Sequence, residues 1–177
     1  MLFSLHRGQE VECVPVQDAS GGALGVGVGD RWPVASLEAH DGGRIDFTAL
    51  DGPVVVYFYP KDGTPTCTRE AAEFNRAYGR YREAGVGLLG VSVDSTTDHE
   101  CFVADEGLRF PLVSDADASI ARRVGVLEDF GKYGELAGRV TFLVDRDGIV
   151  RRVWRLEDAD VEAHPGDALD AARELGG

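Results

Sequence analysis

Cys67 is the residue of this sequence whose type and position best suit chemistry. It follows a loop rich in proline, glycine and threonine and lies at the expected start of a helix. Backbone N–H groups at a helix N-terminus are unpaired and carry partial positive charge, which favours a nucleophilic thiolate. Thr64 and Thr66 could hydrogen-bond the sulfur or an oxygen bound to it, and Arg69 adds a cation. The position indicates a reactive thiol; a buried cysteine that only fills apolar space is the alternative.

Two strands and one helix are expected to position this thiol. Residues 53–59 form a continuous β-branched and aromatic run, which is typical of a strand buried on both faces. A helix is expected over residues 67–84, where aromatic residues recur on one stripe and charges occupy the other side. A second buried strand is expected over residues 86–93. Cys67 therefore lies where a buried strand passes into a helix.

The remaining segments predict an α/β domain. Further expected elements are a hairpin of residues 35–40 and 44–47, a helix from the capping signal at Ser95 to Gly107, a strand at 111–113, a helix at 117–124, strands at 140–144 and 149–154, and a last helix from His164. Strand–helix alternation followed by a hairpin indicates a central mixed β-sheet flanked by helices. We expect one domain over residues 24–177, preceded by an N-terminal extension, residues 1–23, in which residues 10–16 could form an edge strand.

The charge and the hydropathy of the chain exclude some classes of binding partner. The chain has 177 residues, and 18 Lys and Arg against 31 Asp and Glu give a net charge of −13. A chain this acidic repels phosphate backbones and anionic membranes, so we expect neither nucleic acid nor membrane as a partner. No apolar run approaches a membrane span, and the expected location is cytoplasmic. The scarcity of lysine fits either a salt-rich cytoplasm or GC-rich coding.

The chain has three cysteines, Cys13, Cys67 and Cys101. An odd and sparse count argues against a secreted disulfide scaffold. Because the sequence contains no C-x-x-C pair, a structural zinc site is not expected.

The residues around Cys67 resemble a known family. Pro60-x-x-x-Thr64-x-x-Cys67 is similar to the peroxiredoxin active-site signature, and residues 57–71, YFYPKDGTPTCTREA, resemble its bacterioferritin-comigratory-protein, or PrxQ, branch. Further similar stretches are GVSVDS at 90–95, FPL at 110–112 and RVTFLVD at 139–145. Matches at several separated places are more specific than one short motif.

This resemblance implies a thioredoxin-like fold and a thiol-dependent peroxidase of the EC 1.11.1 type. Cys67 would attack hydrogen peroxide or an organic hydroperoxide and become a sulfenic acid, without metal, haem or flavin. Thr64 and Arg139 would position the peroxide and stabilise the thiolate, and Pro60 would shield the site. A thioredoxin-like protein or a small thiol would supply electrons to a monomer or weak homo-oligomer.

Resolution of the sulfenic acid stays open. The PrxQ branch often has a resolving cysteine five residues after the reactive one, but that position is Ala72. A second subgroup places it where this chain has Val103, while Cys101 lies two residues earlier. Cys101 falls on a mostly polar helix face, so we expect it to be partly exposed. Resolution by Cys101, by Cys13 or by an external thiol remain the alternatives.

The sequence disfavours two rival functions. A general thiol–disulfide oxidoreductase is disfavoured because Thr64 stands where a C-x-x-C motif would have cysteine. A non-catalytic binding module is disfavoured because Thr64, Cys67 and Arg139 are all present.

Glu70 is expected in the first helical turn, where a carboxylate stabilises the helix or contributes to the site. His99 is expected to make a structural hydrogen bond.

Overall fold

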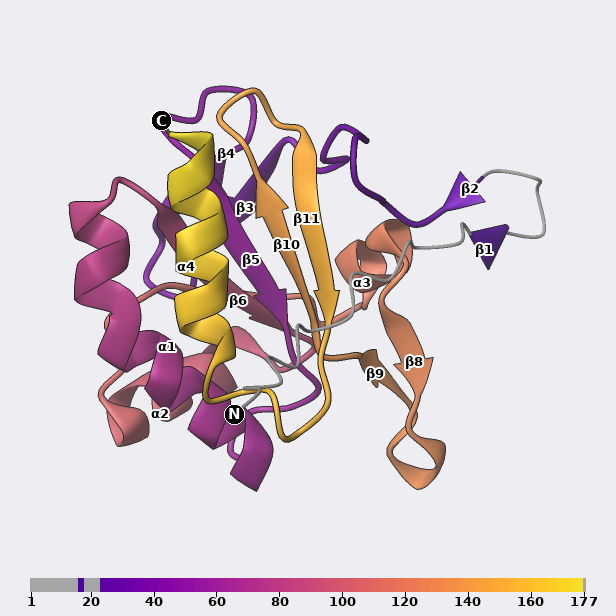
Figure 1. The fold of residues 1–177 in the computed structure, drawn as a ribbon. Helices are drawn as coiled ribbons and strands as arrows, with labels where there is room; N and C mark the ends of the chain where they lie inside the picture. The colour runs from indigo at the N-terminus through magenta and orange to yellow at the C-terminus, as the bar shows by residue number, and fades with distance from the viewer. Residues whose placement is uncertain (1–15, 18–22, 177) are drawn as a thin grey trace, which may run out of the picture.

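The computed structural model describes residues 16–17 and 23–176. At its centre lies a five-stranded sheet in the order β11-β10-β5-β6-β7 (Figure 1). In chain order these strands are β5 (Val54–Phe58), β6 (Gly87–Ser92), β7 (Leu112–Ser114), β10 (Val140–Val144) and β11 (Val150–Arg155). The first three run parallel, whereas β10 is antiparallel to both β5 and β11. The predicted mixed sheet is confirmed.

Different elements cover the two faces of the sheet. The helices are α1 (Pro65–Glu83), α2 (Thr96–Glu106), α3 (Ser119–Val124) and α4 (His164–Leu175). One apolar cluster joins buried residues of α1, α2 and α4 to the sheet, and a second joins those of α3 and the N-terminal part of the domain. All five residues of β5 are buried because alternate side chains enter the two clusters. Figure 1 shows α1 and α4 against the same face.

Six short strands form three two-stranded pairs outside this sheet. They are β1 (Val16–Gln17) with β2 (Ala23–Leu24), β3 (Ser36–Glu38) with β4 (Arg44–Asp46), and β8 (Leu127–Asp129) with β9 (Glu135–Ala137). The β3–β4 hairpin was predicted. The β8–β9 hairpin, with the 3₁₀ turn η1 (Gly131–Tyr133) at its tip, was not. It projects from the body of the domain, and its mostly exposed residues lack the apolar alternation that identifies a strand (Figure 1).

The N-terminal extension is described only in part. Of the edge strand expected at residues 10–16, only Val16 is described, at the start of β1. Cys13 lies outside the described residues. The domain boundary at residue 24 therefore stays a prediction.

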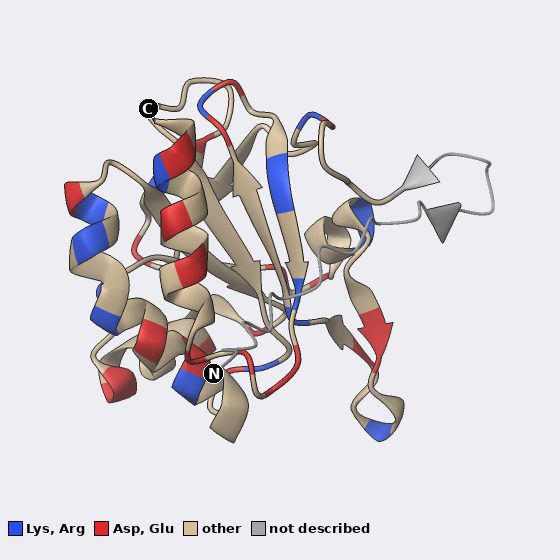
Figure 2. Cartoon of the chain, viewed as in Figure 1, with Lys and Arg blue, Asp and Glu red and all other residues tan. Residues whose placement is uncertain are grey.

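The surface carries the acidic excess seen in the composition. Figure 2 shows acidic residues repeated along α4 and on β8, while basic residues are concentrated on α1 and β11. No helix within the described residues has both the length and the hydropathy to cross a bilayer.

Candidate active site

Cys67 lies in the first turn of α1. Pro65 occupies the first helical position, which suits its fixed φ and missing N–H, so the helix begins two residues earlier than predicted. The first helical hydrogen bond joins the Thr68 N–H to the Thr64 carbonyl at 2.8 Å. The Cys67 N–H precedes this ladder and belongs to the donors that a helix start leaves for other partners. Cys67 itself is buried, with 2% of its surface exposed.

Arg139 brings its guanidinium to this sulfur. Its Nη1 and Nη2 atoms lie 3.7 and 3.6 Å from Cys67 Sγ. The cause is strand register: Val140 pairs with Phe58, so Arg139, one residue before β10, lies at the edge from which the loop after β5 leaves the sheet. A guanidinium is always charged, and a cation beside a cysteine favours the thiolate form. The structure thus places Cys67 and Arg139, two of the predicted site residues, next to each other.

Glu70 is a third member of this group. Its Oε2 atom accepts a hydrogen bond from Arg139 Nη1, and its side chain is fully buried. Burial raises the pKa of Glu70 to about 7, although the charge of Arg139 and its hydrogen bond oppose the rise. Glu70 lies in the second turn of α1, not the first, because the helix begins at Pro65. The spacing of three from Cys67, which places both side chains on one helix face, was the available signal.

Arg139 has a further anionic neighbour on its outer side. Asp158 Oδ1 lies 3.7 Å from Nη2, with most of its side chain exposed. Burial disfavours the charge on Arg139, but Glu70 and Cys67 outweigh it and raise the pKa of the guanidinium. Arg139 therefore remains a cation while it contacts sulfur and carboxylate together.

Thr64 and Pro60 lie in the loop before α1. Thr64 is the N-cap residue, and its hydroxyl donates to the carbonyl of Lys61 at 3.1 Å. The hydroxyl proton is used within the loop, so the lone pairs of Oγ1 are available as acceptors. Pro60 is half-buried, two residues after the end of β5.

Cys101 lies on α2, whose start is fixed by a capping box between Ser95 and Asp98. His99 and Phe102 face inward and are buried, whereas Cys101 is exposed, as predicted from the polar helix face. Cys67 and Cys101 are both free thiols. His99 makes structural hydrogen bonds as expected, to Asp62 Oδ2 at 2.6 Å and to the Val113 carbonyl at 3.1 Å. Across residues 16–17 and 23–176 there is no cluster of three His, Cys, Asp or Glu side chains that could hold a metal ion.

Comparison with known proteins shows the family of this chain. The model of the AhpC/TSA family matches residues 28–153. The chain belongs to the AhpC/TSA family. It is 38% identical over 135 residues to a putative peroxiredoxin bcp of Coxiella burnetii, which covers 74% of this chain and 89% of that protein. It is 37% identical over 130 residues to the chloroplastic peroxiredoxin Q of Suaeda salsa, covering 73% of this chain and 60% of the length of that protein.

Solved structures agree with the peroxiredoxin assignment. The peroxidoxin BcpB of Mycobacterium tuberculosis is 31% identical, with a TM-score of 0.73 over 85% of this chain and 98% of its own. The bacterioferritin comigratory protein of Xanthomonas campestris, studied for its alkyl peroxide reduction activity, is 34% identical, with a TM-score of 0.70 over 81% of this chain and 92% of its own. The predicted thioredoxin-like peroxiredoxin fold is confirmed. The chain is a thiol-dependent peroxidase, with a peroxide as substrate and a thiol as reductant.

Proposed function

We propose that Cys67 reduces hydrogen peroxide and organic hydroperoxides by direct attack on an O–O bond. The Cys67 thiolate forms an S–O bond with one peroxide oxygen while the O–O bond breaks. The other oxygen leaves with the electron pair and takes a proton, giving water or an alcohol and a sulfenic acid at Cys67. The observation that carries this proposal is the pair of Arg139 nitrogens at 3.6 and 3.7 Å from Cys67 Sγ.

Each neighbouring group has a role that follows from its position. The Arg139 guanidinium and the Cys67 N–H stabilise the negative charge that develops on the leaving oxygen. Thr64 Oγ1, whose own proton goes to Lys61, accepts a hydrogen bond from the peroxide O–H and aligns the peroxide with the sulfur. Pro60, half-buried beside this loop, limits the access of water.

Organic hydroperoxides belong to the proposed substrates for two reasons. The related Xanthomonas campestris protein is described by its alkyl peroxide reduction activity. Cys67 also lies in an apolar cluster that includes Tyr59, Ala71 and Trp154, next to which an alkyl group loses contact with water.

Cys101 is the proposed resolving residue. Its thiolate attacks the sulfur of the Cys67 sulfenic acid, an S–S bond forms, and hydroxide leaves and is protonated to water. A thioredoxin-like protein or a small thiol then reduces the disulfide to two thiols. The exposure of Cys101 on α2 supports this order of events, because an incoming reductant can reach it. Resolution by Cys13 or by an external thiol are the competing outcomes.

The proposed working state is a monomer or weak homo-oligomer in the cytoplasm. Within the described residues the exposed large apolar side chains are Val28, Tyr133 and Leu175, which lie in the turn between β2 and β3, in η1 and in α4 respectively. Two free cysteines suit a reducing compartment.

Peroxide consumption by three proteins tests the proposal. Wild type, Cys67→Ser and Cys101→Ser are assayed with hydrogen peroxide and with an alkyl hydroperoxide, each with thioredoxin and with dithiothreitol. Wild type consumes both peroxides and Cys67→Ser consumes neither. Cys101→Ser keeps its first turnover but slows with thioredoxin as the reductant. Full turnover by Cys67→Ser would refute the proposal.

A further inference from the structure

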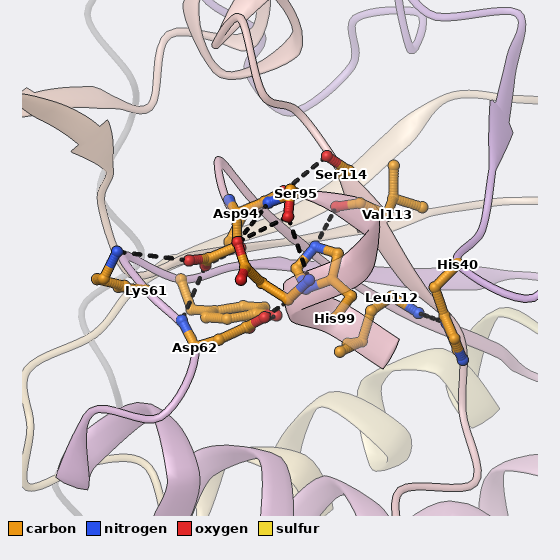
Figure 3. A network of polar contacts seen from close by, with 12 residues as sticks. His40, Lys61, Asp62, Asp94, Ser95, His99, Leu112, Val113 and Ser114 are labelled. Carbon is orange, nitrogen blue, oxygen red and sulfur yellow. Dashed lines mark hydrogen bonds and ion pairs between the residues drawn. The ribbon is translucent and has the colours of Figure 1, made fainter. Parts of the chain in front are cut away.

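His99 is held between two hydrogen-bond acceptors inside the protein. Its ring is fully buried, with Nδ1 at 2.6 Å from Asp62 Oδ2 and Nε2 at 3.1 Å from the Val113 carbonyl oxygen (Figure 3). Asp62 Oδ1 also accepts a hydrogen bond from the Tyr59 hydroxyl at 2.6 Å. A neutral imidazole has one N–H, so beside an ionised Asp62 both contacts are hydrogen bonds only when His99 is the doubly protonated imidazolium.

Asp62 connects this ring to the active-site loop. It lies between Pro60 and Thr64, and its backbone N–H donates to Asp94 Oδ2 at 2.8 Å. Asp94 is fixed in turn by the Ser92 hydroxyl at 2.6 Å. The loop that carries Thr64 and leads to Cys67 is therefore tied by its side chain to α2 and by its backbone to the end of β6 (Figure 3).

We propose that His99 is a positioning residue: as an imidazolium it holds Asp62, and with it the turn from Thr64 to Cys67, in the arrangement that accepts a peroxide, and loss of its ring proton loosens that turn. This inference rests on the proposed role of Cys67. A neutral His99 can donate to Asp62 or to Val113 but not to both. The ring nitrogen without a proton then lies opposite an acceptor oxygen, and that hydrogen bond is lost.

The charges around His99 favour the imidazolium from several sides. Asp62 faces it from the loop, Asp94 from the end of β6 and Asp98 from its own helix, while Lys61 lies 3.7 Å from Asp94 and offsets part of that charge. Tyr59, the residue after β5, has its ring centroid 6.5 Å from that of His99. Burial lowers the pKa of His99, but the hydrogen bond and charge of Asp62 outweigh burial and raise the pKa above its ordinary 6.5.

The raised pKa sets the direction of the pH effect. The imidazolium bonds are complete below the ordinary pKa and are lost as pH rises through the raised folded value. The rate of Cys67 oxidation is expected to lose its His99-dependent part over that range. Because a displacement of about 1 Å at a reacting group can cost about 100-fold, a decrease of about tenfold is expected.

The experiment compares wild type, His99→Asn and His99→Ala in a single-turnover assay of Cys67 oxidation from about pH 6 to about pH 9. The Asn side chain places an amide donor near Nδ1 but does not titrate in this range. Dividing the wild-type rate by the His99→Asn rate at each pH removes the titrations that both share, including that of Glu70. The ratio falls about tenfold with rising pH, and His99→Ala is slow throughout. A ratio that stays constant overturns the proposal.

A spectroscopic measurement keeps the test valid if the variants fold poorly. Ring ¹⁵N shifts are recorded by NMR for the Cys67→Ser protein over the same pH range. His99 is expected as an imidazolium at about pH 6, below its raised pKa, while His164, whose pKa burial lowers to about 4, serves as a neutral reference. A neutral His99 ring at about pH 6 overturns the proposal. This titration does not depend on Cys67, so peroxide turnover by Cys67→Ser would refute the role of Cys67 without changing the measured titration of His99.

Discussion

Glu70 and Arg139 form a buried ion pair beside the reactive sulfur, with Glu70 one helical turn beyond Cys67 on α1 and Arg139 just before β10. The carboxylate holds the guanidinium from one side, and Nη1 and Nη2 remain 3.7 and 3.6 Å from Cys67 Sγ. The pair therefore fixes the direction of the Arg139 fork and not only its charge. A buried pair that loses one partner leaves an uncompensated charge, so both residues should be sensitive to substitution.

Two substitutions of Arg139 should distinguish the effect of its positive charge on Cys67 oxidation from the effect of its planar guanidinium. Arg139→Lys keeps a cation but cannot contact Cys67 and Glu70 with a planar fork, and we expect Cys67 oxidation to slow by about 10- to 100-fold. Arg139→Met removes the charge as well and should cost about 100- to 1,000-fold. Stopped-flow measurement of peroxide reduction checks both values, with Arg122→Lys, an exposed arginine of α3, as the matched control. Equal rates for Arg139→Lys and wild type would contradict the role of the fork.

The stability of Glu70→Gln should depend on pH in a defined direction. The folded pKa of Glu70, about 7, lies above its ordinary 4.5, so protonation stabilises the folded state and this contribution is lost as pH rises through 7. Glutamine does not titrate. Between about pH 4 and about pH 8 the variant should gain on the order of 3 kcal/mol in unfolding free energy relative to wild type. Urea unfolding at the two pH values measures this, and a constant difference would argue against a buried, titrating Glu70.

Oxidation by one equivalent of hydrogen peroxide should show how the sulfenic acid is resolved. If Cys101 on α2 is the resolving residue, intact mass and peptide mapping will find an intramolecular disulfide between Cys67 and Cys101. Cys13→Ser should form the same bond at the same rate. A persistent sulfenic acid in wild type, or a disulfide that contains Cys13, would exclude Cys101.

His164 should make the fold sensitive to acid. Burial lowers the pKa of this residue to about 4, and its Nε2 atom lies 2.8 Å from Thr141 Oγ1. The unfolded chain binds a proton near the ordinary value of 6.5, so stability present above 6.5 is lost as pH falls towards 4. The loss should reach on the order of 3 kcal/mol. His164→Gln, which cannot titrate here, should show a smaller decrease in urea unfolding between about pH 7 and about pH 4; an identical decrease would refute this cause.

Local sequence patterns predicted most of the elements that position the site. The apolar run of β5, the stripe of α1 and the cap of α2 depend on neighbouring residues, and these elements appear close to their expected bounds. Contacts between residues far apart in the chain could be predicted less well from the sequence. The pairing of Arg139 with Glu70 spans 69 residues, and the pairing of His99 with Asp62 spans 37. Each depends on how a loop and a helix meet in three dimensions, which periodicity does not encode.

The start of α1 illustrates the same limit on a smaller scale. Proline at position 65 suits a first helical turn, but the residue pattern predicts a helix that begins only at Cys67. Because the observed helix begins two residues earlier, Glu70 lies in its second turn and not in its first. There it forms the buried pair with Arg139 and does not stabilise the helix end. The β8–β9 hairpin was missed because its residues are mostly exposed and show no apolar alternation.

Trapping of the oxidised sulfur tests the central claim most directly. Cys101→Ser protein is treated with one equivalent of hydrogen peroxide in the presence of dimedone, which reacts with sulfenic acids, and its peptides are analysed by mass spectrometry. The account predicts one adduct per chain, located on Cys67, and none when Cys67 is also replaced by serine. An unmodified Cys67 beside an adduct on Cys13, or peroxide consumption that leaves Cys67 as a free thiol, would contradict it.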